Sequence, residues 1–453
     1  MEPTDELKHS GDSASAMHTR APASRTQQKA SFVDAFRPQS GSNVQRIYGI
    51  SDCVIAVAFT LLVENIRLPS AGLSEPQLQS YILHTILPDL LVYLFSYLVV
   101  ASSWISHYRI FTYLQRSSSL FIMLNVLFLA SIVFLPVTVV FFYGYGNQAA
   151  IWQVFATTQV VTSATLLLMW VVARVDHLLD SEVPPEYLRY TTARLFVIPI
   201  GTLLSIGIAF YNVWVAEGIF LSFYVLGWSL RSLYYRRHPG SGYLEGTTRI
   251  CSITDNMTAV AITFLIAAIT GTLLSNIHQP FSTTLGAVLG ELPVYSFSLL
   301  IVGFYWLSHH RIYMVIRRHN MMLIWLNFAF LLCIELQPPF NTLHATYPKS
   351  QLTTILYASN QAVTGLMLLV IWLYAARGHR LIDKSIDGSQ IISIALRVLL
   401  PPMIFTLSIA IILFRNDLAI YFWLLVIVLE VIDLVYRRVR RGSHREARAE
   451  ADV

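Results

Sequence analysis

Apolar runs long enough to cross a lipid bilayer recur along almost the whole chain and limit what it can fold into. A membrane-spanning helix needs about 20 predominantly apolar residues. The chain of 453 residues is 55% hydrophobic and 13% charged, a balance that excludes a soluble protein of this size. Runs of spanning length occur near residues 50–67, 82–105, 119–142, 150–173, 192–213, 215–235, 252–274, 288–308, 321–337, 354–376, 390–414 and 417–436. We therefore expect an all-α polytopic membrane protein with twelve transmembrane helices.

The basic residues are distributed as the topology of a membrane protein requires. If the N-terminus is cytosolic, the extracytosolic loops hold only Arg67, Lys349 and Arg415 of the 31 Lys and Arg residues. Cytosolic loops of membrane proteins carry an excess of Lys and Arg. We therefore expect both termini to be cytosolic. The net charge of +5 then follows from topology and gives no reason to expect a nucleic-acid partner.

The two halves of the chain repeat each other. Trp104–Arg109 (WISHYR) corresponds to Trp306–Arg311 (WLSHHR), and Pro136 corresponds to Pro338, each at an offset of 202. Six spans is an even number, so the halves insert in the same orientation as two parallel six-helix repeats about an axis along the membrane normal, which suits a central pore. The predicted organisation is a disordered cytosolic tail at 1–45, a first repeat at 46–236, a short cytosolic linker at 237–248, a second repeat at 249–438 and a basic cytosolic tail at 439–453.

A charged motif opens the first span of each half. Arg46 and Asp52 recur as Arg249 and Asp255, each at an offset of 203. Charges at the mouth of a spanning helix are costly and mark a functional site by default. The polar residues grouped by this motif are Arg46, Ser51, Asp52, His107 and Asn125 in the first half, and Arg249, Thr254, Asp255, His309 and Asn327 in the second. We favour a hydrogen-bonded clamp between helices over direct ion binding, and two histidines without cysteines or paired carboxylates do not indicate a metal site.

One face of each first helix is a candidate pore lining. Residues at helical spacing share a face, and these are Val57, Thr60, Leu61 and Glu64 in the first half and Val260, Thr263, Phe264 and Ala267 in the second. Around a pore, the valines and the Leu/Phe layer would form an apolar constriction that hinders conduction by dewetting. Alternatively, the stripe packs against neighbouring helices. Glu64 either faces the extracytosolic mouth of the pore or lies at the interface and pairs with Arg67.

Other motifs point to no catalytic chemistry. Pro184–Tyr187 (PPEY) fits a ligand for WW-type modules, although a proline turn is the simpler interpretation. The sequence contains no P-loop, Rossmann fingerprint, HExxH motif or nucleophile elbow. We therefore expect neither an enzyme nor a bound cofactor.

The charged motif carries a family resemblance. The signature at Arg46 and Ser51-Asp52, the run Asp52–Val63 (DCVIAVAFTLLV) and the Trp104–Arg109 segment resemble the transmembrane protein 175 family of potassium channels. The second copies of these segments resemble it too, and the likeness covers all twelve spans. It implies a homodimer in which four first helices surround one pore for K⁺, with a possible additional proton leak. It also implies a gate at Val57 and Val260, with Thr60 and Thr263 nearby.

The sequence departs from the family pattern at the gate and beyond it. Valines stand where the family has isoleucine or leucine, and Glu64 stands in a layer that is normally apolar. The resemblance implies an endosomal or lysosomal membrane if the protein is eukaryotic, and a plasma membrane otherwise. The competing interpretation is a twelve-helix secondary transporter of the major-facilitator type, which also has two parallel six-helix halves. The short linker at 237–248 argues against it.

Overall fold

The computed structural model describes residues 42–238, 242, 244–419 and 421–432. The predicted tails at 1–45 and 439–453 therefore lie almost wholly outside the described residues. Within the described part, eleven helices are long and apolar enough to cross a membrane. Residues 421–432 are also helical, and the twelfth predicted span at 417–436 extends beyond them into residues that are not described. The prediction of an all-α membrane protein built from two six-helix repeats is confirmed.

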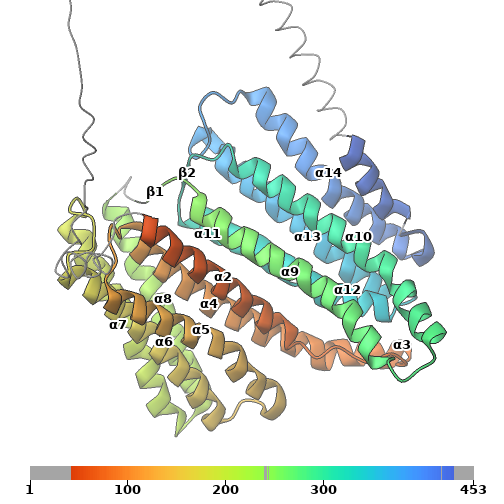
Figure 1. Cartoon of the computed structure of the whole chain (residues 1–453), viewed down its shortest axis with the longest axis horizontal. Coiled ribbons are helices and arrows are strands. Elements are labelled where there is room, and N and C mark those ends of the chain that lie inside the picture. Colours follow the sequence, from red (N-terminus) through yellow and green to blue (C-terminus); the bar gives the residue numbers. More distant parts are fainter. Residues whose placement is uncertain (1–41, 239–241, 243, 420, 433–453) are drawn as a thin grey trace, which may run out of the picture.

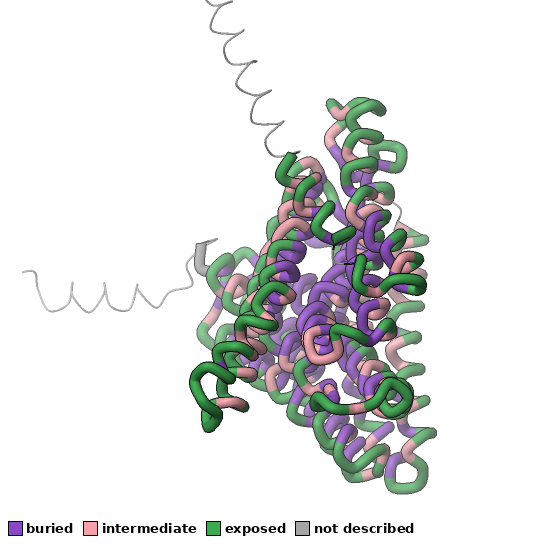
Figure 2. Tube along the Cα trace, turned by 90° about the vertical axis from the view of Figure 1, so that its right-hand side faces the viewer, coloured by how far each residue is buried: buried purple, intermediate pink, exposed green. Residues whose placement is uncertain are grey.

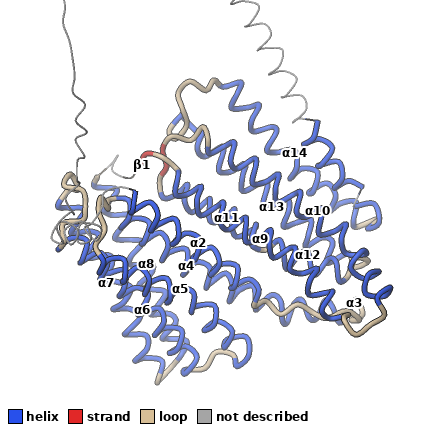
Figure 3. Tube along the Cα trace, in the orientation of Figure 1, coloured by secondary structure: helices blue, strands red, loops and turns tan. Residues whose placement is uncertain are grey.

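Both repeats use the same order of helices. The first repeat consists of α2 (Ser42–Glu64), α3 (Glu75–Tyr81), η1 (Ile82–Ile86), α4 (Leu87–Thr112), α5 (Ser119–Tyr145), α6 (Ala149–Val175), α7 (Pro185–Ala209) and α8 (Val213–Arg237). The second consists of α9 (Thr248–Ser275), α10 (Phe281–Tyr313), α11 (Met321–Glu335), α12 (Gln337–Thr346), α13 (Gln351–Ala376), η2 (Arg377–His379), α14 (Gly388–Ile412) and η3 (Asn416–Leu418). Two short strands, β1 (Leu244–Glu245) and β2 (Arg318–His319), pair at one end of the bundle (Figure 3).

Matched caps begin corresponding helices. Ser118 accepts a hydrogen bond from the Phe121 backbone N–H at the start of α5, and Asn320 accepts one from Leu323 at the start of α11. Such caps satisfy N–H groups that have no partner inside the helix. Their shared register shows that the duplicated sequence specifies helix boundaries as well as apolar runs.

The third span differs between the repeats. In the first repeat α5 continues through Pro136, whereas in the second the helix ends at Glu335 and α12 begins at Gln337. Pro338 and Pro339 follow each other there. Each proline lacks a backbone N–H, so the pair removes two successive helical donors and interrupts the ladder.

The two first helices lie side by side in the middle of the molecule. Figure 1 shows α2 and α9 running in the same direction, with α6, α7 and α8 on one side and α10, α13 and α14 on the other. Buried residues are concentrated inside the bundle (Figure 2). The fold therefore brings the two copies of the charged motif into direct contact.

A histidine ties the linker between the repeats to the first repeat. His319, on β2, bonds through Nδ1 to the Gly246 carbonyl and through Nε2 to the Tyr108 hydroxyl, each at 2.5 Å. The carbonyl can only accept, so Nδ1–H donates and Nε2 accepts from Tyr108. Burial lowers the pKa of His319 below 6.5, although the bond to Gly246 opposes this shift. The neutral ring thus joins α4, the linker and β2.

The PPEY segment begins a helix. Pro185 is the first residue of α7, and Tyr187 is buried with its ring 4.8 Å from that of Tyr113. A proline at the first helical position costs nothing, because that N–H has no intrahelical partner anyway. The segment is therefore part of the fold, and its buried tyrosine is not presented to a WW-type partner.

Candidate functional site

Asp52 is the centre of a polar site between the repeats. Its carboxylate is fully buried and accepts a hydrogen bond of 2.8 Å from Trp104 Nε1. Arg249 of α9 donates to it from Nη2 at 3.0 Å and from Nε at 3.3 Å. The ion pair thus links the first helix of one repeat to the first helix of the other. Arg46, which the sequence analysis grouped with these clamp residues, has no bond to Asp52 among the described residues.

A chain of hydrogen bonds extends from this ion pair through the first repeat. Arg249 Nη2 donates to His107 Nδ1 at 2.7 Å, so His107 is neutral at that nitrogen and carries its proton on Nε2. Nε2 in turn donates to Asn125 Oδ1 at 2.8 Å. Asn125 Nδ2 donates to Ser51 Oγ at 3.0 Å, and Ser51 donates to the Ile47 carbonyl. Four of the five predicted clamp residues of the first repeat, all except Arg46, therefore meet in one network that is closed by Arg249.

Aromatic rings surround the Arg249 guanidinium. Its central carbon lies 5.2–5.5 Å from four ring centroids, those of Tyr48, Trp104, Tyr108 and Phe111. An arginine over aromatic faces gains cation–π stabilisation, which is larger where water is excluded. Only 7% of the Arg249 surface is exposed. The site therefore holds a buried charge by combining a carboxylate with an aromatic cage.

The corresponding site of the second repeat is built only in part. Trp306 Nε1 donates to Asp255 at 2.8 Å, His309 bonds to Asn327 at 2.8 Å, and Asn327 donates to Thr254 at 2.9 Å. However, Asp255 is exposed and no cation pairs with it among the described residues. Arg46 is likewise exposed and has no partner in the described part of the chain. The second clamp thus has its carboxylate and its chain of hydrogen bonds from His309 through Asn327 to Thr254, but it lacks an arginine.

The predicted pore face is largely uncovered. On α2, Val57 is 36% exposed, Leu61 is half-buried and Glu64 is exposed. Thr60 is fully buried, and its hydroxyl donates to the Ala56 carbonyl, which removes it from this face. The counterparts on α9 are accessible to different extents: Val260 and Phe264 are half-buried, and Thr263 and Ala267 are exposed.

Glu64 does not pair with Arg67. Arg67 instead donates to the carboxylate of Asp89 on α4, from Nη2 at 2.8 Å and from Nε at 3.0 Å. Asp89 is buried, so this two-pronged ion pair satisfies a carboxylate that would otherwise be costly. Glu64 is left exposed at the end of α2, next to the uncovered face.

Besides Asp89, a second buried carboxylate was not predicted from the sequence. Glu335 ends α11 at the proline break, is fully buried, and has no hydrogen-bond partner on either carboxylate oxygen. Thr60 is its polar neighbour. An acidic residue inside an apolar run, directly before two prolines, was the available signal. It has no acidic counterpart in the first repeat, where position 133 is valine.

The comparison with known proteins follows the same duplication. The family described as "Endosomal/lysosomal potassium channel TMEM175" matches twice, at residues 46–136 and at residues 249–338. Each match begins at the motif arginine and ends at the proline of the third span, so it contains one complete clamp. The chain is similar to this family over both segments. The resemblance found in the sequence is therefore confirmed over the first three spans of each half, and the other six spans lie outside the two matches.

Several named channel proteins are similar to parts of this chain. It is 27% identical over 172 residues to a "Potassium channel" of Streptomyces collinus, covering 37% of this chain and 82% of that protein. It is 25% identical over 151 residues to the "Endosomal/lysosomal proton channel TMEM175" of Danio rerio, covering 33% of this chain but only 29% of that protein. A crystal structure of a lysosomal potassium-selective TMEM175 homologue from Chamaesiphon minutus aligns with a TM-score of 0.36 at 25% identity, covering 42% of this chain and 97% of that one.

Proposed function

We propose that the protein is a potassium-permeable cation channel whose pore runs between four first helices, α2 and α9 from each of two chains. The observation that carries this proposal is the α2–α9 pair: two first helices held in contact by a buried cross-repeat ion pair, with uncovered apolar faces. The names of the relatives, potassium channel and proton channel, support K⁺ as the permeant ion, with protons as a second one. They do not favour a secondary transporter.

The half-built second clamp supports a homodimer. Residues six apart on a helix lie about 120° apart around it, so each first helix offers its arginine to one neighbour and its aspartate to another. Within the chain this head-to-tail contact is made once, from Arg249 to Asp52. Head-to-tail contacts form a closed ring when the rotation closes. In the proposed dimer, Arg46 of each chain reaches Asp255 and His309 of the other, and four helices close the ring.

The constriction in this proposal is apolar. Val57 and Val260 form its narrowest layer, and Leu61 with Phe264 forms the next. Rings of apolar side chains can gate a pore by dewetting. Thr263 and Ala267 line the wall beyond, whereas Thr60 supports the wall from behind. Valine is shorter than the isoleucine or leucine that the family resemblance implies at this position, so the constriction is wider than one formed by those residues.

Glu64 is proposed to lie at the extracytosolic mouth, with both termini cytosolic. Its counterpart Ala267 is neutral, so a dimer presents two carboxylates at the mouth, which attract cations. The membrane in this proposal is that of an endosome or lysosome if the protein is eukaryotic, and the plasma membrane otherwise. No catalytic step is part of the proposal.

Two measurements test the proposal. Purified protein in a planar bilayer should give unitary currents that reverse near the K⁺ equilibrium potential, whereas turnover-limited uptake without unitary currents would indicate a transporter. The mass in nanodiscs should be that of a dimer. Arg46→Asp should shift it toward the monomer, and Asp255→Arg in the same chain should restore it. Arg377→Asp, an exposed charge elsewhere, is the control. A conducting monomer would contradict the assembly.

A further inference from the structure

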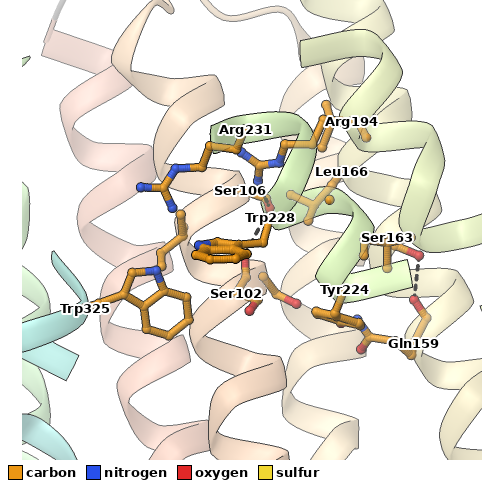
Figure 4. A pocket seen from close by; sticks show the side chains of 15 residues that line it. Ser102, Ser106, Gln159, Ser163, Leu166, Arg194, Tyr224, Trp228, Arg231 and Trp325 are labelled. Carbon is orange, nitrogen blue, oxygen red and sulfur yellow. Dashed lines mark hydrogen bonds between the residues drawn. The ribbon is translucent and has the colours of Figure 1, made fainter. Parts of the chain in front are cut away.

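A basic pocket lies within the first repeat, away from the clamp and the pore face. It is formed by α4, α6, α7 and α8 and is bordered by Trp325 of α11 (Figure 4). Two arginines reach it, Arg194 from α7 and Arg231 from α8, and none of its lining residues is acidic. The remaining polar groups belong to serines, a glutamine and a tyrosine. A pocket of this kind within a helical bundle concentrates positive charge without supplying an anion.

The positive charge in this pocket is incompletely compensated. Arg194 donates to Ser106 Oγ at 2.7 Å, a neutral acceptor. Arg231 is half-buried and has no hydrogen bond or ion pair with any described residue. The charges of Arg194 and of buried Arg109 both act on Arg231, and Arg109 is bonded to the neutral Tyr235 hydroxyl. Cations at membrane depth are stable when they are paired, so this cluster favours an anion from outside the chain.

The second repeat offers an internal comparison. Its related cavity is lined by Ser308, Arg311 and Arg397, which correspond to Ser106, Arg109 and Arg194. That cavity is also lined by Glu430, so there the chain provides its own carboxylate. The first-repeat pocket is lined by Arg194 and Arg231 and by no acidic residue. In the second cavity a carboxylate of the same chain can balance the positive charge of the arginines, whereas the first-repeat pocket contains no such carboxylate.

We propose that the first-repeat pocket binds the phosphate-bearing headgroup of an anionic phospholipid. Basic pockets between transmembrane helices bind such headgroups. Arg231 lies in the last two turns of α8, close to Arg236 and Arg237, which places the guanidinium groups near the membrane interface. The pocket also carries apolar side chains, Leu166 and Ile198, and Trp228 at its edge is 63% exposed. An acyl chain can leave along this apolar edge into the bilayer, whereas a free anion gains nothing from it.

The test is native mass spectrometry of the purified full-length protein, titrated with phosphatidylglycerol and, separately, with phosphatidylcholine. Wild type should bind phosphatidylglycerol more tightly. Each arginine near an anionic group contributes about 1 kcal/mol, so Arg194→Gln or Arg231→Gln should weaken this binding about fivefold and the double variant roughly thirtyfold. Arg231→Lys should largely restore it. Arg189→Gln, which changes an exposed arginine on α7, and Arg397→Gln in the second cavity should leave phosphatidylglycerol binding unchanged.

A second arm separates the lipid from a soluble anion. Inorganic phosphate added in excess should fail to displace phosphatidylglycerol, because it lacks the acyl chains. Displacement by phosphate alone would assign the pocket to a soluble phosphate and overturn the lipid proposal. Equal binding of the two lipids, or unchanged binding in a double variant that elutes as a folded protein, would overturn the site itself.

Discussion

The clamps of the first and second repeats contain matching residues at matching spacing, yet they differ in state. Asp52 is fully buried and paired with Arg249 inside an aromatic cage, whereas Asp255 is exposed and receives a hydrogen bond from Trp306. The same tryptophan, histidine and asparagine relay stands behind both carboxylates. The difference arises from the neighbour: α2 lies against α9, and the outer side of α9 faces no first helix within the chain.

This contrast shows that the arginine of one copy of the motif pairs with the aspartate of the other copy. An arginine six residues before an aspartate cannot reach it on the same helix, because the two side chains diverge around the axis. The motif is therefore a connector between adjacent helices. One connection is made inside the chain, and the proposed dimer would supply the other. If the two clamps have the same role, a change at the paired first clamp and the same change at the unpaired second clamp should differ in their effects.

The largest expected difference is between Asp52→Asn and Asp255→Asn. Asp52→Asn leaves the buried Arg249 guanidinium without an anion, and breaking a buried pair costs about 3–5 kcal/mol. We expect mostly aggregated protein in size-exclusion chromatography after extraction. Asp255→Asn removes an exposed charge, so each chain should fold, and only the dimer fraction should fall. Equal behaviour of the two variants would show that the clamps are not in different states.

The valines test whether the repeats contribute equally to the throat. Val57→Ala and Val260→Ala should each raise single-channel conductance in a bilayer and weaken the preference for K⁺ over Na⁺, because a wider throat demands less ion dehydration. The double variant should do both more strongly, and Val→Leu at both positions should reduce current. Leu168→Ala, an exposed apolar residue on α6, is the control and should leave conductance unchanged. Unchanged conductance in the double variant would assign the valines to helix packing.

The hydrogen bonds of His319 to Gly246 and Tyr108 have no equivalent in the first repeat, where the corresponding residue at position 117 is serine. Because burial lowers the pKa of His319 below 6.5, the unfolded chain binds more protons than the folded one as the pH falls below about 6.5. Its contribution to stability is therefore complete above that pH and decreases as the pH falls towards the lowered pKa. We expect His319→Gln to reduce the loss of thermal stability in detergent between neutral and acidic pH. An identical pH dependence in variant and wild type would remove this role.

The smallest effect is expected at Glu64, where the repeats differ outright because its counterpart is Ala267. Glu64→Gln should modestly lower conductance at low salt, where the attraction of two mouth carboxylates for cations is least screened. High salt should abolish the difference. Ala267→Glu would complete a ring of four carboxylates and should raise conductance instead. If both variants conduct like wild type at low salt, position 64 lies outside the ion pathway.

Much of the fold could be predicted because it depends on local chemistry. Transferring a spanning run of apolar residues into lipid is favourable wherever the rest of the chain lies, so the spans were predictable. The break between α11 and α12 was harder, because Pro136 alone leaves α5 continuous whereas Pro338 with Pro339 does not. The burial of Thr60 was also missed. Helical spacing defines a face but cannot show how far a neighbouring helix covers its edge.

The sequence by itself determined the all-α membrane class, the duplication and four polar residues of the first clamp, Ser51, Asp52, His107 and Asn125, since each follows from hydrophobic length or from repeated spacing. Only the tertiary structure decided which charges meet. Arg249 bonds to Asp52 because α9 packs against α2, and Arg67 bonds to Asp89 although Glu64 is nearer in sequence. Likewise, Arg194 and Arg231 come from different helices and share a pocket only after α7 and α8 pack together. Charge pairing depends on distances between helices, and no local pattern contains those distances.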